Sequence, residues 1–255
     1  MELPILSFSE YIVCELDESI DIENGRLVFN ADDNKDTGVK TSFGKSKKLT
    51  PFTKTIEGTD GSIAYSLYQA KTRNSTDILK SMKSVDFSDP EVQQFLNRSA
   101  IYAARVLRSL KVDIIVTPKS SSDLTKEFVK QVQRRSNYDV LIDSFTKRPD
   151  LSKVQIDVDH PKITPDIIKS MQSILKRAIK DGRLSIKMFA PQHRKFVINM
   201  FEVTDPKIVD KIQDKSVMII DDVLTSGTTI KNIYDILMTN NANNVSGMTI
   251  FKSNK

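Results

Sequence analysis

Two adjacent carboxylates and a group of hydroxyl side chains occur together in the segment VMIIDDVLTSGTTI, residues 217–230. The apolar residues before the acidic pair predict a buried strand, and the residues after Gly227 have the spacing of a helix. Backbone N–H groups at a helix N-terminus, hydroxyl donors and a glycine that permits close approach together form a cradle for an anion. We therefore expect a phosphate group to bind the turn formed by Thr225, Ser226, Gly227, Thr228 and Thr229.

The acidic pair, Asp221 and Asp222, lies where the predicted strand ends, and open parallel sheets bind ligands beyond that end. Two carboxylates beside a phosphate repel one another unless each finds a donor or a cation. Ribose hydroxyls can donate charge-assisted hydrogen bonds to them, and Mg²⁺ can bind their oxygens and a diphosphate at once. A ligand with all these features is 5-phosphoribosyl 1-diphosphate (PRPP), so both aspartates are candidate catalytic and Mg²⁺-binding residues.

This segment resembles, residue by residue, the PRPP-binding signature of the type I phosphoribosyltransferases, from the apolar run through Asp221-Asp222 to Thr229. The resemblance implies a glycosyltransferase of nucleotide metabolism. Such an enzyme uses Mg²⁺ to move the phosphoribosyl group of PRPP to an acceptor, expected to be a nitrogenous base, and releases diphosphate. The alternative for the segment alone is an ordinary strand-turn-helix with a capping threonine and surface carboxylates.

A second turn with polar side chains follows the apolar run VDIIVT at residues 112–117 and contains Pro118, Lys119 and three serines, Ser120 to Ser122. It resembles the pyrophosphate loop of the same family. By that analogy Lys119, Ser120 and the neighbouring amides hold the leaving diphosphate. The glycine usual in that loop is missing, and the alternative is a plain turn with serine caps.

Residues 183–203 lie where such enzymes carry a loop that closes over PRPP. The spacing of Arg194, Asn199 and Phe201 resembles the ComF-like branch of the family. Arg194 is then a candidate catalytic residue that clamps the diphosphate, because its guanidinium offers a fixed fork of donors, and Lys195 supports it. The alternative is a β-hairpin whose basic residues are merely solvated.

The elements that must position these turns alternate along the chain. Helical spacing follows Asp89-Pro90, and Thr164-Pro165 and Gly182 bound a further helix. Short apolar runs at residues 112–117, 138–143 and 216–221, and the run NVSGMTIF, predict strands. This order favours an α/β fold with a parallel sheet covered by helices on both faces. We expect this core domain over residues 86–255.

Residues 1–85 contain glycine-rich turn clusters and short strands, RLVF and SIAYSLYQA, which predict an irregular β-containing accessory or hood lobe. In the second strand Tyr65 and Tyr68 alternate with small or apolar residues, as packed strand residues do. Contact with the acceptor is the alternative for these tyrosines.

Composition limits the other functional classes. The single cysteine, Cys14, excludes an internal disulfide and a cysteine metal cage, and two histidines, His160 and His193, are too few for a His-rich site. No run of 18 apolar residues occurs, and Glu2 and Glu10 stand where a secretory signal would be positive. We therefore expect a cytoplasmic protein with no membrane partner.

The net charge of +5 and the pI near 9.1 raise the question of a nucleic-acid partner. The basic residues are scattered, with no long block beyond Lys45–Lys48, so an ordinary solvated surface or a small anionic substrate explains the excess as well. The remaining alternative to an enzyme is a protein that binds PRPP or a nucleotide without catalysis, in a regulatory or nucleic-acid-associated role. Dimers are common among such folds, so a homodimer is one expected assembly.

Overall fold

The structure is a computed structural model that describes residues 19–23, 26–30, 39–41, 52–70, 85–120 and 122–252. Its strands are β1 (Ser19–Glu23), β2 (Arg26–Asn30), β3 (Val39–Thr41), β4 (Phe52–Thr55), β5 (Ile63–Ala70), β6 (Ile114–Pro118), β7 (Asp139–Lys147), β8 (Gln155–Ile156), β9 (Val197–Ile198), β10 (Phe201–Val203), β11 (Ser216–Leu224) and β12 (Asn244–Lys252). Its helices are α2 (Pro90–Ser109), α3 (Leu124–Arg134), α4 (Pro165–Lys180), α5 (Lys207–Ile212) and α6 (Thr228–Thr239), with short 3₁₀ helices η1 (Leu151–Lys153), η2 (Ile186–Met188) and η3 (Pro191–Phe196). Cys14, Ser121 and the Lys45–Lys48 block lie outside the described residues.

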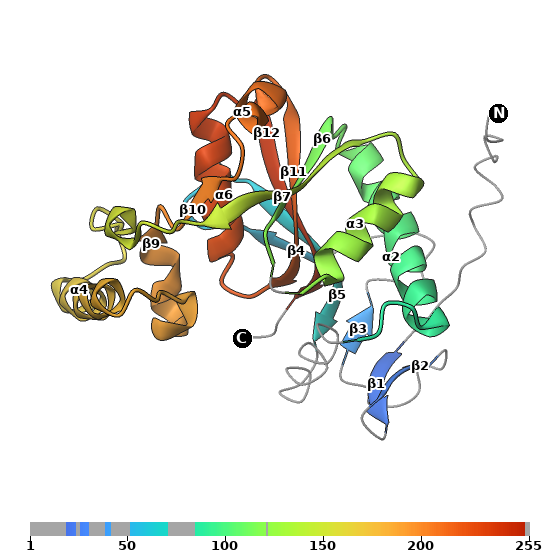
Figure 1. The fold of residues 1–255 in the computed structure, drawn as a ribbon, viewed down its shortest axis with the longest axis horizontal. Helices are drawn as coiled ribbons and strands as arrows, with labels where there is room; N and C mark the ends of the chain where they lie inside the picture. The colour runs from blue at the N-terminus through green and yellow to red at the C-terminus, as the bar shows by residue number, and fades with distance from the viewer. Residues whose placement is uncertain are drawn as a thin grey trace.

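The central sheet has eight strands in the order β10-β7-β6-β11-β12-β5-β3, with β4 also paired to β5. The inner strands β7, β6, β11, β12 and β5 run parallel to their neighbours, whereas β10, β3 and β4 are antiparallel additions at the two ends of the sheet. Helices cover both faces, α2 and α3 on one and α5 and α6 on the other (Figure 1). The predicted α/β fold with a mostly parallel, helix-flanked sheet is therefore confirmed.

The boundary expected at residue 86 stays a prediction, but β5 lies before it and pairs with β12 along five residue pairs. Tyr68 of β5 is completely buried, and its hydroxyl lies 2.8 Å from Ser99 Oγ in helix α2. Its ring packs against Phe95 and Phe251, with ring centroids 5.1 and 5.6 Å away. Tyr68 is therefore a packing residue of the central core, the first of the two roles that the sequence left open.

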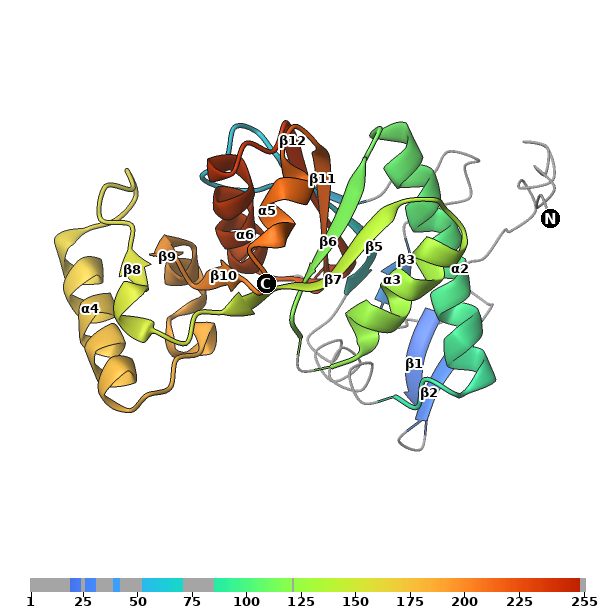
Figure 2. The ribbon, with the colours of Figure 1, turned by 45° about the horizontal axis from the view of Figure 1, so that its top comes forward.

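A feature that the sequence did not predict is the insertion, residues 148–200, which leaves the sheet after β7 and returns to it at β10. It contains α4, the small antiparallel pair β8 and β9 and the three 3₁₀ helices. Figures 1 and 2 both show it projecting from the side of the sheet opposite to α2 and α3. Among the described residues, no helix is long and apolar enough to cross a membrane.

Candidate functional site

Strand β11 carries the acidic pair to the edge of the sheet. Its pairing with β6 ends at Ile219, whereas its pairing with β12 continues to Leu224. The predicted strand end at residue 221 was three residues short, because only one neighbour continues that far. Asp221 and Asp222 therefore lie beyond the last β6 pair, on a strand still held by β12. On the β6 side, no described strand pairs with either residue.

A hollow opens at this edge, and we call it the strand-end hollow. It is small, with a cavity volume of about 30 Å³, and it opens to solvent. It is lined by Ile186, Asp221, Val223, Leu224, Thr225, Ser226, Gly227, Thr228, Thr229 and Ile230. The structure thus brings together Asp221 and the whole turn predicted from the sequence. Asp222 is 6% exposed and is absent from this lining, as expected for consecutive residues of a strand, which face opposite sides.

The turn owes its shape to two glycines. Gly227 has φ +84° and ψ +3°, a left-handed conformation that costs other residues energy, and it immediately precedes helix α6. Gly247 of β12 lies under the first turn of that helix, where a Cβ atom would be only 2.8 Å from a methyl group of Ile230. Close packing of α6 on the sheet thus fixes the start of the helix beside Asp221.

The N-cap residue of α6 is Gly227, which has no side chain to cap the first amides, and no capping hydrogen bond from a described side chain is present. By contrast, Asp89 caps α2 and Thr164 caps α4 through side-chain hydrogen bonds. The hydroxyls of Ser226 and Thr228 lie 2.8 Å apart, directly beside the amides. A helix N-terminus with amides left for a ligand and neighbouring hydroxyl donors is suited to a phosphate group.

Lys54 of β4 adds a cation that the sequence did not suggest. Its Nζ donates a hydrogen bond of 3.0 Å to the Thr225 carbonyl. Burial and then the neighbouring Lys252 lower the pKa of Lys54, whereas Glu57 raises it. A cation on this carbonyl polarises the peptide group and makes its N–H, which belongs to Ser226, a stronger donor to an anion. Lys54 is 171 residues from Thr225, so no local pattern indicates the contact.

The second predicted turn follows β6, the parallel neighbour of β11, and therefore lies at the same edge of the sheet. Lys119 is exposed, and its backbone N–H donates to the Phe145 carbonyl at 2.6 Å. Ser120 accepts a 3.3 Å hydrogen bond from the Ser122 amide. Helix α3 begins after Asp123, whose side chain makes no capping hydrogen bond. The two helices that start beside this edge, α3 and α6, thus both lack side-chain caps.

Two hydroxyls strengthen the case for this second turn. The Oγ of Ser122 and the Oγ1 of Thr125 are buried and have no hydrogen-bond partner among the described residues. A buried hydroxyl without a partner costs about 1–3 kcal/mol, so such groups usually meet water or a ligand. Lys119 and Ser120 do not line the strand-end hollow. Their contact with a diphosphate stays a prediction.

The insertion positions Arg194 and Lys195 differently from the expected clamp. Arg194 Nε donates to the Phe189 carbonyl at 3.1 Å, inside the insertion. Lys195 Nζ lies 3.0 Å from the Glu57 carboxylate, which also binds Lys162 at 2.8 Å. These two lysines hold the pKa of Glu57 at about 2. Neither Arg194 nor Lys195 lines the strand-end hollow. The segment forms 3₁₀ helices and short strands instead of the β-hairpin that was the alternative, and the clamp by Arg194 and Lys195 stays a prediction.

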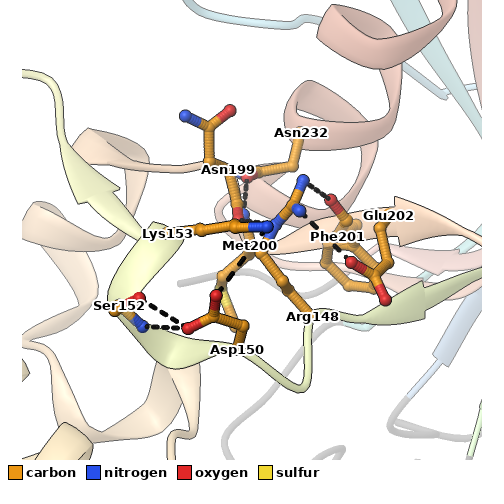
Figure 3. Close-up of polar contacts among 9 residues, drawn as sticks. All are labelled: Arg148, Asp150, Ser152, Lys153, Asn199, Met200, Phe201, Glu202 and Asn232. Carbon is orange, nitrogen blue, oxygen red and sulfur yellow. Dashed lines mark hydrogen bonds and ion pairs between the residues drawn. The ribbon is translucent and has the colours of Figure 1, made fainter.

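The base of the insertion is held by Arg148 (Figure 3). Its guanidinium donates to the Asn199 and Phe201 carbonyls and to Glu202 Oε2, each at 3.2 Å. Asn199 has φ +58°, and its side chain donates to Gln155 within the insertion. Phe201 is buried. In this structure Asn199 and Phe201 therefore serve the junction between insertion and sheet. Their relation to the ComF-like branch stays a prediction.

Asn232 joins the insertion to helix α6. Its Oδ1 accepts the Met200 amide at 2.8 Å, and its Nδ2 donates to the carbonyls of Val197 and Thr228 at 2.9 and 3.0 Å. The residue is only 2% exposed. Because Thr228 lines the strand-end hollow, one side chain links the insertion to the predicted phosphate turn. Its place inside a helical pattern gave no sign of this role. His160 and His193 pack against Phe196.

Among the described residues, no three His, Cys, Asp or Glu side chains are grouped in a way that could hold a metal ion alone. Asp221 and Asp222 supply only two carboxylates. Of the two, only Asp221 lines the strand-end hollow, and one carboxylate together with substrate phosphates is still a donor set that Mg²⁺ accepts.

No protein-family model and no curated protein matches the chain. Similar solved structures include a hypoxanthine phosphoribosyltransferase from Staphylococcus aureus, with a TM-score of 0.35, 14% identity, and 62% of each chain covered. A hypoxanthine-guanine phosphoribosyltransferase from Bacillus anthracis has a TM-score of 0.35 and 12% identity, over 62% of this chain and 65% of that one. A purine phosphoribosyltransferase from Pyrococcus horikoshii has a TM-score of 0.33 and 13% identity, over 63% of this chain and 84% of that one. The chain thus spans less than two thirds of the first two enzymes, and likenesses this weak carry no argument about its own activity.

Proposed function

We propose that this protein is a phosphoribosyltransferase-like protein that binds PRPP at the strand-end hollow and transfers its phosphoribosyl group to a nitrogenous base. The observation that carries the proposal is the pair of turns after the neighbouring parallel strands β6 and β11. Both turns lead into helices without side-chain caps, and Asp221 lies beside one of them. One ligand with a phosphate, a pentose and a diphosphate has groups for each of these features.

In this proposal the 5′-phosphate binds the turn of residues 225–229, with Lys54 strengthening the Ser226 amide through the Thr225 carbonyl. Asp221 accepts hydrogen bonds from the ribose hydroxyls. The turn after β6 binds the diphosphate through Lys119, the local amides and the hydroxyls of Ser122 and Thr125. Asp221 would also hold Mg²⁺, which would neutralise charge on the diphosphate when bound; Asp222 is buried on the other side of the strand and would join it only if its side chain left that position.

The reaction breaks the bond between the anomeric carbon and the diphosphate oxygen and forms a bond to a nitrogen of the base. The bonding electrons leave with the diphosphate, the nitrogen's lone pair makes the new bond, and the proton that the nitrogen carried passes to the diphosphate or to water. Positive charge develops on the sugar in the transition state, so a carboxylate near the ring stabilises it. The protein therefore acts mainly by positioning and electrostatics. Ile186 of the insertion lines the hollow and helps to exclude water from it.

A second candidate function is PRPP binding without transfer. It is favoured by the positions of Arg194 and Lys195, which bind Phe189 and Glu57 in this structure, and by the missing glycine in the turn after β6. A catalytic clamp from the insertion would require both side chains to leave these partners. The ComF-like assignment, a cytoplasmic location and a homodimer belong to the same set of proposals.

One experiment separates these functions. Diphosphate release from PRPP and Mg²⁺ is measured with a panel of purine, pyrimidine and pyridine bases, while PRPP affinity is measured by calorimetry. Release that requires one base supports the enzyme. Binding without release for every base supports the second candidate, and absence of PRPP binding overturns both.

A further inference from the structure

The positive charge of the protein is concentrated in the insertion. Residues 148–200 contain 11 Lys and Arg but only five acidic residues, all of them Asp, which gives a net charge of +6. The whole chain has a net charge of +5, so the other 202 residues together carry −1. Acidic and basic residues looked evenly mixed in the sequence because the basic residues of the insertion do not form a continuous block. The fold gathers them on one projecting part of the molecule (Figure 2).

Helix α4 arranges part of this charge as a row. Met171, Leu175 and Ala178 are buried on one side of the helix. At 3.6 residues per turn, Lys169, Lys176 and Lys180 fall within about 40° of one another on the opposite side. All three are exposed, and none forms an ion pair with a described residue. We call this set the α4 lysine row.

The row has the dimensions of a phosphate-backbone contact. From Lys169 to Lys180 it extends about 16 Å, at 1.5 Å per residue. Each strand of a nucleic-acid duplex carries about one phosphate charge per 3.4 Å of the axis, so this length spans roughly five phosphates of one strand. Arg177 of the same helix is also exposed, as are Arg183 and Lys187 in the segment that follows it. Flexible lysine stems allow each ammonium to reach a phosphate without a fixed geometry.

The composition of the insertion distinguishes among anionic partners. Single strands are commonly bound by aromatic side chains that stack on bases, and membrane surfaces by aromatic anchors. The insertion has no Trp or Tyr, and its two phenylalanines, Phe189 and Phe196, are buried. We propose that the exposed face of α4 binds nucleic acid by contacting the phosphate backbone of a double helix, whether or not the strand-end hollow binds PRPP.

Fluorescence anisotropy of the full chain with a labelled 30-base-pair duplex, from 50 to 300 mM NaCl, tests this proposal. DNA and RNA duplexes, the matching single strand and vesicles containing phosphatidylserine are measured in parallel. We expect the logarithm of the association constant for the duplex to fall linearly with log[NaCl]. The triple variant K169E/K176E/K180E should lose at least about tenfold in affinity at 100 mM NaCl. The slope of that salt dependence should be shallower by about 2.7 for the triple variant than for the wild type, because each of the three lost phosphate contacts contributes about 0.9.

The matched control is K207E/K211E/K215E, which changes the net charge equally on exposed lysines in and just after α5. It should weaken duplex binding less than about threefold. The neutral variant K169Q/K176Q/K180Q should lie between the wild type and the charge reversal. Thermal unfolding checks that every variant folds. An equal loss in the control, tighter binding to the single strand, or binding to vesicles but not to duplexes would each overturn the proposal.

Discussion

The turn at residues 225–229 and the insertion at residues 148–200 both contribute residues to the lining of the strand-end hollow. The turn is shaped by contacts between residues close in sequence, whereas the insertion is held by contacts between residues far apart in sequence. In the turn, the donors, the hydroxyls and Gly227 lie within five residues, and the neighbouring Asp221 belongs to the same strand-turn-helix unit. The insertion reaches the hollow through Ile186, and its place depends on Asn232, Glu57 and Arg148, each remote in sequence from its partners. A ligand-binding turn can thus be formed by contacts within a short segment, while the part of the chain that covers it is held by contacts between distant segments.

Among the variants considered below, we expect the loss of the Asn232 side chain to reduce stability most, because it joins the insertion to helix α6. Asn232→Ala removes three hydrogen bonds and leaves the Met200 amide and the Val197 carbonyl buried without this partner. Each such group costs about 1–3 kcal/mol, so we expect the free energy of unfolding to fall by about 2–5 kcal/mol in urea denaturation. Asn240→Ala is the control, because Asn240 donates to its own helix at Ile236 and does not bind the insertion. An equal loss in both variants would show that Asn232 does not hold the insertion.

The next largest effect concerns the local element. Asp221→Asn keeps the shape of the side chain but removes the charge that is proposed to accept the ribose hydroxyls. A hydrogen bond to a charged group contributes about 1.5–3 kcal/mol, so PRPP affinity in calorimetry should fall about 10- to 100-fold. The melting temperature should change little. Asp210→Asn, on exposed helix α5, is the control and should leave affinity unchanged. Affinity within twofold of wild type for Asp221→Asn would remove Asp221 from the proposed site.

Gly227→Ala tests the left-handed backbone conformation of the turn separately from steric crowding. An added Cβ would meet only Leu224 Cδ1, at 3.8 Å, so the cost is the strain of a left-handed alanine, about 1–2 kcal/mol of unfolding free energy. Gly61→Ala is matched to it, since Gly61 has φ +73° and an added Cβ there meets nothing within 4 Å. Both variants should lose similar stability, but only Gly227→Ala should also weaken PRPP binding. If Gly61→Ala weakens it equally, the effect comes from general destabilisation.

The contrast between the two regions also explains what the sequence could predict. The strands β6, β7, β11 and β12 and the helices α4 and α6 follow from periodicity and capping signals within short windows, whereas the left-handed backbone of Gly227 was seen only in the structure. The acidic pair was placed at the correct edge because parallel strands end there together. Local signals sufficed wherever the contacts themselves were local.

The roles of Arg194, Lys195 and the insertion required long-range contacts that no window contains. Lys195 and Glu57 are 138 residues apart, and Asn232 is 32 residues from Met200. The basic character of residues 148–200 was visible only after the fold separated them from the rest. Lys54 illustrates the same limit: its strand β4 pairs with the nearby β5, but the Thr225 carbonyl that it contacts lies 171 residues away.

The smallest expected effect comes from Glu57, which connects the turn between β4 and β5 to Lys162 and Lys195 of the insertion. The lysines lower its pKa from 4.5 to about 2, so its carboxylate stabilises the folded state above pH 4.5. That contribution should disappear as the pH falls from 4.5 to about 2. Glu57 is 41% exposed, and solvent screening limits such pairs to less than about 1 kcal/mol.

Glu57→Gln should therefore unfold more easily than wild type in urea at pH 7, and the difference should shrink with decreasing pH and with added salt. Glu127→Gln is the control, because Glu127 pairs with Lys130 on the same helix and joins no second element. If the insertion depends on Glu57, protease cleavage within residues 148–200 should also become faster in Glu57→Gln and not in Glu127→Gln. Equal cleavage would mean that Asn232 and Arg148 hold the insertion without help from the Glu57 ion pairs, since the contacts of Asn232 and Arg148 remain in both variants.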